Sequence, residues 1–239
     1  MTPRLFLPPG ARLPGEGEAV ELAPGQRHYL THVLRRRPGD RVVLLDGEGE
    51  AEATLLPDLR LSCGAARRAE APRLRVTLLC ALLKGEKLDW VVEKATELGA
   101  ARILPVACAR SVRRLEPARA IRQRERWARI ATAAAQQCRR PDLPQVTAPM
   151  SFAEALRLES SHDGATLRLM LYEGTAPPVR SLLGESQTRI ALFIGPEGGL
   201  AKTEIDALFT AGFLPCSLGP RILRAETAAL AALAVVLSG

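Results

Sequence analysis

Asparagine is absent from this 239-residue chain, and aromatic residues make up only 4% of it. A lack of thermolabile amides suits a thermophile, and a GC-rich genome gives the same bias, so both explanations stay open. The cysteines are odd in number, and no two have the spacing of a zinc site or a redox pair: Cys63, Cys80, Cys108, Cys138 and Cys216. We therefore expect reduced thiols and a cytoplasmic protein.

Long apolar runs and clustered metal ligands are also missing. The longest apolar stretch, residues 228–237, is too short to span a bilayer. The first residues show no charged and then apolar leader, so we expect no signal peptide. His28, His32 and His162 lack the spacing of metal ligands. The sequence thus predicts neither a membrane nor a metal as a partner.

Positive charge is concentrated in one part of the chain. The net charge is +7, but residues 102–140 alone carry +9, with eleven arginines, no lysine, and only Glu116 and Glu125 as acids. Such a block is typical of a polyanion-binding surface, although an arginine-rich helix face that only meets solvent is the simpler alternative. We expect RNA contacts. The candidate residues are basic side chains in or near this block and in the N-terminal part: Arg4, Arg35, Lys84, Arg110, Arg122, Arg126, Arg129 and Arg140.

The N-terminal part of the chain has the pattern of β-structure. Short strands are predicted at residues 4–7 and 41–45, and Asp46-Gly47 is a hairpin signal before a returning strand at 48–56. Residues 26–36 form a short helix candidate. We expect a small β-barrel domain over residues 1–70, followed by a polar linker in residues 65–73.

From residue 74 onward, predicted strands alternate with predicted helices, which favours an α/β domain with a mostly parallel sheet over residues 74–239. The strands are expected at 74–83, 102–106, 166–171, 190–194 and 213–218. Long helices are expected at 87–98, 117–138 and 225–237. Ser151 and Glu154 form a capping box before a short helix, and Thr203 is expected to cap another that ends at Gly212.

Two glycine- and proline-containing segments follow predicted strands and precede predicted helices. They are residues 194–199 (IGPEGG) and 218–228 (LGPRILRAETA). Glycine permits a close approach of the backbone to a ligand, while Pro196 and Pro220 stiffen the two loops. Ligand sites of α/β proteins lie at the carboxyl ends of strands, so we expect one pocket built from both loops.

Nucleotide-binding loops are excluded at two places. A phosphate-binding loop needs glycine directly before its lysine and another five residues earlier, but Ala201 and Pro196 occupy these positions relative to Lys202. The segment Gly47–Glu50 lacks the third glycine of a dinucleotide fingerprint, and its acids would repel a pyrophosphate.

The polar residues of the two loops leave several roles open. Glu197 could accept a hydrogen bond from a substrate, remove a proton from it, or hold its own loop in place. Arg224 and Glu226 are close enough in sequence to form a purely structural pair. Thr227 could cap the last helix instead of contacting a ligand.

The two segments resemble the cofactor loops of the SPOUT-class RNA methyltransferases, and specifically the bacterial family that methylates N3 of a uridine in small-subunit ribosomal RNA. The family pattern of Gly-Pro-Glu-Gly-Gly followed by Leu-Gly-x-Arg-Ile-Leu-Arg-x-Glu-Thr-Ala is present without a gap. The resemblance extends through residues 89–99, 110–111 and 137–138, and so covers most of residues 74–239. One departure is Gln136, where the family often has glutamate, so no carboxylate role is carried over to that position.

This resemblance implies an S-adenosylmethionine-dependent methyltransferase with a C-terminal trefoil-knotted domain, an N-terminal PUA-like domain, and a homodimer interface beside the cofactor loops. It implies Glu197 and Arg224 as catalytic candidates. The implied cofactor-binding residues follow three strands: Leu171, Tyr172, Glu173, Ile194, Gly195, Pro196, Glu197, Gly198, Gly199, Leu218, Gly219, Ile222, Leu223, Arg224, Thr227 and Ala228. The alternative is a non-catalytic RNA-binding or ribosome-assembly factor that has kept the fold.

Overall fold

A computed structural model describes residues 2–8, 10–70, 72–111, 117–160 and 166–238. The chain forms two compact units, the first from residues 1–71 with residues 135–143, and the second from residues 72–134 with residues 144–239. The acid Glu116 of the basic block and His162 lie outside the described residues.

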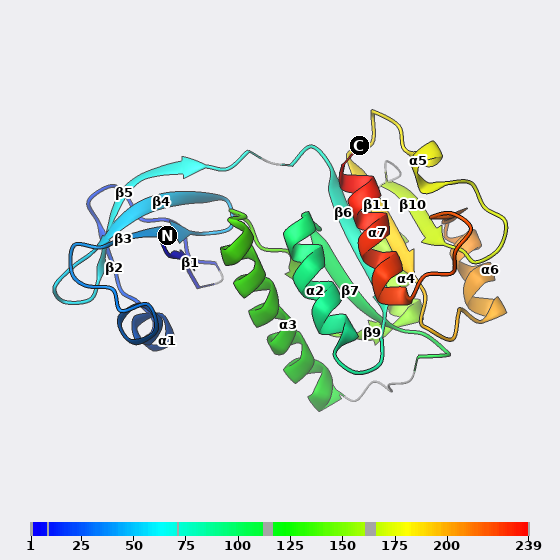
Figure 1. The fold of residues 1–239 in the computed structure, drawn as a ribbon, viewed down its shortest axis with the longest axis horizontal. Helices are drawn as coiled ribbons and strands as arrows, with labels where there is room; N and C mark the ends of the chain where they lie inside the picture. The colour runs from blue at the N-terminus through cyan, green and yellow to red at the C-terminus, as the bar shows by residue number, and fades with distance from the viewer. Residues whose placement is uncertain (1, 9, 71, 112–116, 161–165, 239) are drawn as a thin grey trace. The chain divides into compact units, whose positions relative to one another are not determined.

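The first unit contains a curled five-stranded sheet in the order β1-β3-β4-β5-β2 (Figure 1). Its strands are β1 (Arg4–Phe6), β2 (Ala19–Val20), β3 (Arg41–Leu45), β4 (Gly49–Leu55) and β5 (Leu61–Arg68). β1 pairs with β3 in parallel, and the other pairs are antiparallel. The predicted strands are confirmed, but β5 continues to Arg68, so the predicted linker at 65–73 was placed too early.

The helix predicted at residues 26–36 consists of two parts. An α-helical turn, α1 (Pro24–His28), continues directly into a π-helical turn, η1 (Tyr29–Val33). Leu30 is fully buried in the core of the first unit. The imidazole rings of His28 and His32 stack on the exposed side, with their centroids 4.6 Å apart.

The second unit is built on a seven-stranded sheet with the order β12-β10-β11-β6-β7-β8, and β9 also pairs with β7. Every recorded pairing in this sheet is parallel. In chain order the elements are β6 (Arg75–Ala81), α2 (Lys87–Leu98), β7 (Arg102–Ala107), α3 (Pro117–Cys138), β8 (Gln145–Val146), β9 (Met150–Ser151), α4 (Phe152–Ser160), β10 (Thr166–Leu171), α5 (Val179–Leu182), β11 (Arg189–Ile194), α6 (Lys202–Thr210), β12 (Leu214–Cys216) and α7 (Ala225–Leu237). This confirms the predicted α/β class with a mostly parallel sheet.

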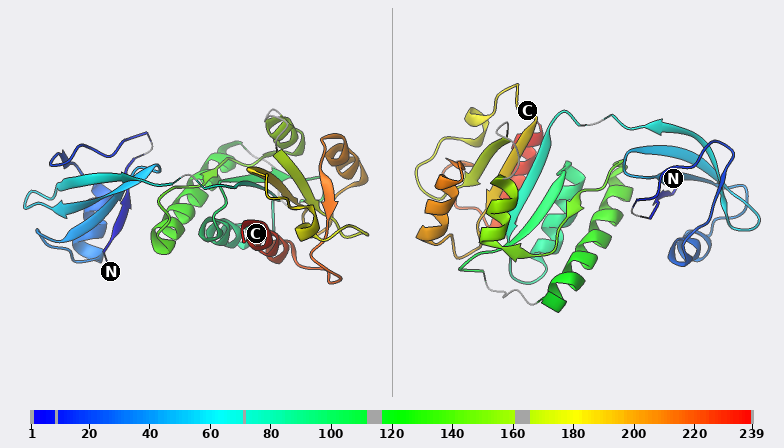
Figure 2. Two further views of the ribbon diagram at one scale, coloured as in Figure 1. Left: turned by 90° about the horizontal axis from the view of Figure 1, so that it is seen from above. Right: turned by 180° about the vertical axis from the view of Figure 1, so that it is seen from behind.

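Helices cover both faces of this sheet, as Figure 2 shows. Alternate residues of one strand belong to two different cores: Leu78 packs with side chains of α2, α3, α5 and α7, while Leu79 packs with side chains of α4 and α6. A strand that is buried on both faces reads as a continuous apolar run, which explains the sequence of β6.

Most predicted helix boundaries are confirmed. α2 ends at Gly99, whose φ of 104° is left-handed and therefore suits glycine. The capping box of α4 forms, since Ser151 N–H donates to Glu154 at 2.8 Å. The predicted cap of α6 is wrong: Ala201, not Thr203, is the N-cap, and Glu204 accepts its N–H at 2.9 Å.

Five elements were not predicted. β2, β8, β9 and α5 have only two to four residues each, and β5 overlaps the segment that was predicted to be a linker. The last residues of α3 belong to the first unit, where Ala135 packs with Phe6 and Leu45. The trefoil knot implied by the resemblance stays a prediction.

Candidate active site

Three parallel neighbours, β12, β10 and β11, end at the same edge of the sheet. Leu171 is paired in register with Cys216, and Met170 with Phe193. The N–H of Tyr172 donates to the carbonyl of Cys216 at 3.0 Å. This register brings together the three segments that were predicted to bind the cofactor: residues 171–173, 194–199 and 218–228.

The first loop, after β11, is a tight turn in which a larger residue at its start would crowd a neighbouring side chain. The N–H of Gly199 donates to the carbonyl of Pro196 at 2.9 Å, and Gly199 has a φ of 70°. A Cβ atom at Gly195 would lie 3.1 Å from the side chain of Leu200. The guanidinium of Arg110 donates to the carbonyl of Gly198 at 3.1 Å, so the segment after β7 braces this loop.

Glu204 connects that bracing segment to the start of α6. Its side chain is buried and accepts the N–H of Ala109 at 2.7 Å and the N–H of Ala201 at 2.9 Å. The bond to Ala109 fixes the backbone next to Arg110 and so helps to hold Arg110 against the first loop. Glu204 was not predicted from the sequence as a site residue, although its position three residues after an N-cap is a capping-box signal.

The second loop, after β12, is fixed by its own backbone. The hydroxyl of Ser217 accepts the N–H of Gly219 at 3.1 Å, and Gly219 has a left-handed φ of 113°. Arg224 is the N-cap of α7, with an extended backbone and no side-chain capping bond. Thr227 is therefore not the cap of α7, which removes that alternative for its role.

Glu197 holds the first loop against the start of α2. One of its carboxylate oxygens accepts the N–H of Lys84 at 3.3 Å and the ammonium of Lys87 at 3.0 Å. Partial burial raises the pKa of Glu197, but hydrogen bonds from its own backbone, from Lys87 and from Lys84 outweigh this effect and lower the pKa below its ordinary value. A carboxyl with a lowered pKa is a poor proton acceptor, so these contacts favour loop anchoring among its three possible roles.

Lys87 links both loops, because its ammonium also lies 3.3 Å from Glu226 at the start of α7. Hydrogen bonding with Glu197 is the main cause that raises the pKa of Lys87, and so it stays charged. A structural pair of Arg224 with Glu226 was one alternative from the sequence, but Glu226 pairs with Lys87 instead, and no ion pair joins it to Arg224 in the described part of the chain. Lys87 was not among the predicted site residues, since one lysine at a helix start carries no signal of its own.

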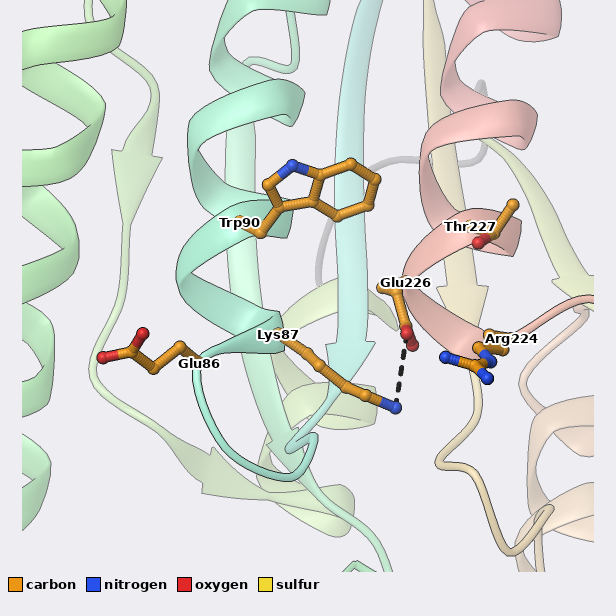
Figure 3. A pocket seen from close by; sticks show the side chains of 6 residues that line it. All are labelled: Glu86, Lys87, Trp90, Arg224, Glu226 and Thr227. Atoms are coloured by element: carbon orange, nitrogen blue, oxygen red, sulfur yellow. Dashed lines mark ion pairs between the residues drawn. The ribbon is translucent and has the colours of Figure 1, made fainter.

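An open pocket of about 490 Å³ lies between α2 and α7 (Figure 3). It is lined by Glu86, Lys87, Trp90, Arg224, Glu226 and Thr227. Of the predicted cofactor residues, only Arg224 and Thr227 line this pocket, while the others belong to the strand-end loops. The strand-end loops and the pocket are therefore two neighbouring features, and they share only the residues at the start of α7.

Three of the predicted RNA-binding arginines are engaged in ion pairs. Arg4 contacts Glu50 at 2.7 Å and is largely buried. Arg140 contacts Asp142 at 2.7 Å and is 9% exposed. These two side chains are poorly placed to bind phosphate.

The third, Arg126, pairs with Asp89 and with Glu86. Asp89 also accepts the indole N–H of Trp127 at 2.8 Å, so this contact fastens α3 to α2. Arg126 therefore has a structural role, which its spacing in the basic block did not reveal.

The remaining RNA candidates are exposed: Arg35, Lys84, Arg110, Arg122 and Arg129. Arg122 and Arg129 lie on α3, and Arg119 continues the same helix face one turn earlier. Within the described residues, none of these three α3 arginines forms an ion pair. These three arginines thus leave exposed positive charge on α3 that no described acidic side chain pairs with.

No group of three or more metal-ligating side chains gathers anywhere in the described ranges, and no described helix is long and apolar enough to cross a membrane. The five cysteines are unpaired. Burial raises the pKa of Cys80 to about 12 and also raises that of Cys108 and Cys216, so these thiols are unreactive core residues.

A parallel sheet with glycine-containing loops at its carboxyl edge, together with an arginine-rich helix, is typical of an α/β protein that binds a small ligand and a polyanion. A model of the RNA methyltransferase domain family matches residues 69–237, and a model of the RNA methyltransferase PUA domain matches residues 22–56. The chain belongs to this family of RNA methyltransferases.

Relatives with the same description support this assignment. The chain is 34% identical to ribosomal RNA small subunit methyltransferase E of Bacillus subtilis, over 92% of this chain and 90% of that protein. It is 38% identical to the Synechocystis protein of that name, over 91% and 72%. The crystal structure of the Neisseria gonorrhoeae enzyme bound to S-adenosyl methionine is 30% identical, with a TM-score of 0.85, and the match covers 100% of this chain and 98% of that one.

Proposed function

We propose that this protein transfers the methyl group of S-adenosylmethionine to N3 of a specific uridine in small-subunit ribosomal RNA. The observation that carries the proposal is the register of β10, β11 and β12, which brings the three predicted cofactor segments to one edge of the sheet. The names of the relatives and the cofactor in the Neisseria structure support it.

The loops suit a ligand whose binding depends on backbone shape. A Cβ atom at Gly195 would crowd the side chain of Leu200, and Gly199 and Gly219 have left-handed backbones that other residues adopt only with strain. S-adenosylmethionine supplies an electrophilic methyl group when it is bound. The glycines of the chain bring backbone N–H and carbonyl groups to the ligand, and positioning of the two reactants supplies much of the rate.

Two charged residues support the reaction in different ways. Glu197, which is tied to Lys84 and Lys87, keeps the first loop in its binding conformation. Arg224 lies at the junction of the second loop and the pocket, where its cation stabilises negative charge that develops on the uracil ring as N3 releases its proton to water.

RNA binding follows from the exposed face of α3 together with the N-terminal unit. We propose an RNA-binding PUA-like domain over residues 1–70 and a methyltransferase domain over residues 74–239. Simultaneous replacement of Arg119, Arg122 and Arg129 by glutamate should lower the affinity for ribosomal RNA and reduce its salt dependence. The control changes net charge equally through three exposed arginines on other elements: Arg157, Arg180 and Arg189. Equal losses in both variants would assign the effect to net charge alone.

A homodimer would cover the apolar side of α7 that the chain itself leaves open. Leu230, Ala231 and Ala234 are only partly buried, whereas Ala232 is fully buried in the core of its own unit. We propose that the partly buried residues form the contact between two copies, beside the second loop. A reducing compartment such as the cytoplasm fits the five unpaired thiols.

The alternative function, a ribosome-assembly factor without catalysis, predicts RNA binding but no methyl transfer. The direct test mixes the purified protein with labelled S-adenosylmethionine and either small-subunit or large-subunit RNA, free and as assembled subunits. Label in small-subunit RNA alone supports the proposal. RNA binding without incorporation into any of the four substrates would favour the assembly factor.

A further inference from the structure

Glu226 lines the pocket between α2 and α7, and one of its two carboxylate oxygens accepts no hydrogen bond among the described residues. One carboxylate oxygen lies 3.3 Å from the ammonium of Lys87, which is a long contact. The other oxygen is buried and has no hydrogen-bond partner among the described residues. An unpaired buried acceptor lowers stability, so such an atom in a pocket points to a ligand that donates a hydrogen bond.

The carboxylate selects the kind of donor. An ionised carboxylate only accepts hydrogen bonds, and its terminal torsion is broad enough to turn either oxygen toward the pocket. Uracil carries a hydrogen on N3, whereas N3 of cytosine is an acceptor with a lone pair. A carboxylate opposite N3 therefore attracts uracil and repels cytosine.

The other lining residues fit the rest of a uracil ring. Trp90 is 43% exposed and extends from α2 toward α7, where its indole offers a flat surface for stacking (Figure 3). Lys87 and Arg224 are donors beside Glu226, as Figure 3 also shows. The two carbonyl oxygens of uracil flank N3, so a donor–acceptor–donor arrangement in the pocket complements that edge of the base.

We propose that this pocket holds the target uracil and that Glu226 determines specificity by accepting a hydrogen bond from N3–H. This inference rests on the proposed function, since it names the group that recognises the base. The pocket adjoins the predicted cofactor loops at Arg224 and Thr227, so a uracil held there would lie beside a methyl donor that those loops hold.

Substitution of Glu226 by glutamine keeps the size and shape of the side chain but replaces one accepting carboxylate oxygen by a donating amide NH₂ group. Lys87 only donates, so it retains the amide oxygen beside it and leaves the amide NH₂ for the ligand. Polyuridylate and polycytidylate serve as probes, because they share one backbone and differ at the base edge. Each is tested as an inhibitor of methyl transfer to small-subunit RNA, and as a ligand of the full-length protein by fluorescence titration.

The wild-type protein should bind polyuridylate about tenfold more tightly than polycytidylate, and Glu226→Gln should bring this ratio to one or below. Trp90→Ala should weaken both polymers equally, because stacking tolerates any base. Glu93→Gln is the control, because Glu93 also belongs to α2 but does not line the pocket, and it should match the wild type in every measurement.

Two results would overturn the inference: an unchanged ratio in Glu226→Gln, or equal weakening of both polymers, which is the mark of a merely structural residue. The titration does not require turnover, so it is independent of the proposed reaction. A wild-type protein that discriminates between the polymers but transfers no methyl group would contradict the proposed function and leave the base pocket standing.

Discussion

Replacement of Glu204 by alanine removes the contact that ties the segment after β7 to the start of α6. The carboxylate is 6% exposed and accepts two backbone N–H groups, from Ala109 at 2.7 Å and from Ala201 at 2.9 Å. Hydrogen bonds to a charged group contribute about 1.5–3 kcal/mol each. Because both donors belong to partly exposed residues that water can reach, the lower end applies. The variant also no longer bears the cost of burying a carboxylate, which offsets part of this sum. We therefore expect the free energy of unfolding to fall by about 2 kcal/mol.

Urea unfolding followed by tryptophan fluorescence is the suitable assay. Trp90 and Trp127, the two tryptophans of the chain, both lie in the second unit, so the signal reports that unit. The unfolding midpoint should fall while its slope stays constant. Arg110, which follows Ala109, should lose its fixed position against Gly198, so the affinity for S-adenosylmethionine should fall as well.

Glu154→Ala is the matched control. Glu154 has the same position in the capping box of α4 and also accepts a backbone N–H, that of Ser151, but its side chain is exposed. Water replaces its contacts, so its loss should lower the midpoint much less. If both variants shift the midpoint equally, burial of Glu204 does not stabilise the site and the reasoning is wrong.

Three further predictions concern the loops and the assembly. Gly219→Ala should strongly weaken S-adenosylmethionine binding in calorimetry. Gly212→Ala, at another left-handed glycine that lies away from the loops, should not. If both variants bind S-adenosylmethionine with the same affinity, the second loop is not part of the site. Leu230→Arg should give a monomer in light scattering. Phe209→Arg, which puts the same charge on an exposed apolar residue of α6, should leave the dimer intact. A dimeric Leu230 variant would place the interface elsewhere. Because the pKa of Glu197 is lowered from 4.5 in the folded protein, its anchoring is complete above that value and is lost as the pH falls through the lowered pKa. Cofactor affinity should fall in the same acidic range, and Glu197→Gln should abolish that part of the pH dependence.

The long elements of the second unit could be predicted from the sequence, because one physical rule dominates each of them. α2 has an apolar stripe that ends at a left-handed glycine, and β6 is apolar after Arg75 except for Thr77, since both its faces are covered. Short elements such as β8 have too few residues for any periodicity to appear. They exist because of their neighbours in the sheet.

The candidate site could be predicted only as far as its loops. The glycine-rich segments carry a pattern, but the contacts that fix them come from residues far away in the sequence. Lys87 reaches Glu197 across 110 positions, and Glu204 reaches Ala109 across 95. Arg126 and Arg140 looked like phosphate ligands by charge alone, and only the fold shows that each has an acidic partner.

Nucleoside analysis of ribosomal RNA from cells that lack this protein tests the central claim most directly. Small-subunit RNA is isolated from the deletion strain and from the strain that carries the gene again, digested to nucleosides, and examined by mass spectrometry against N3-methyluridine and its positional isomers. We predict that N3-methyluridine disappears from small-subunit RNA in the deletion strain and returns on complementation. Unchanged N3-methyluridine, or the loss of a methyl group from a ribose or another base instead, would contradict the account.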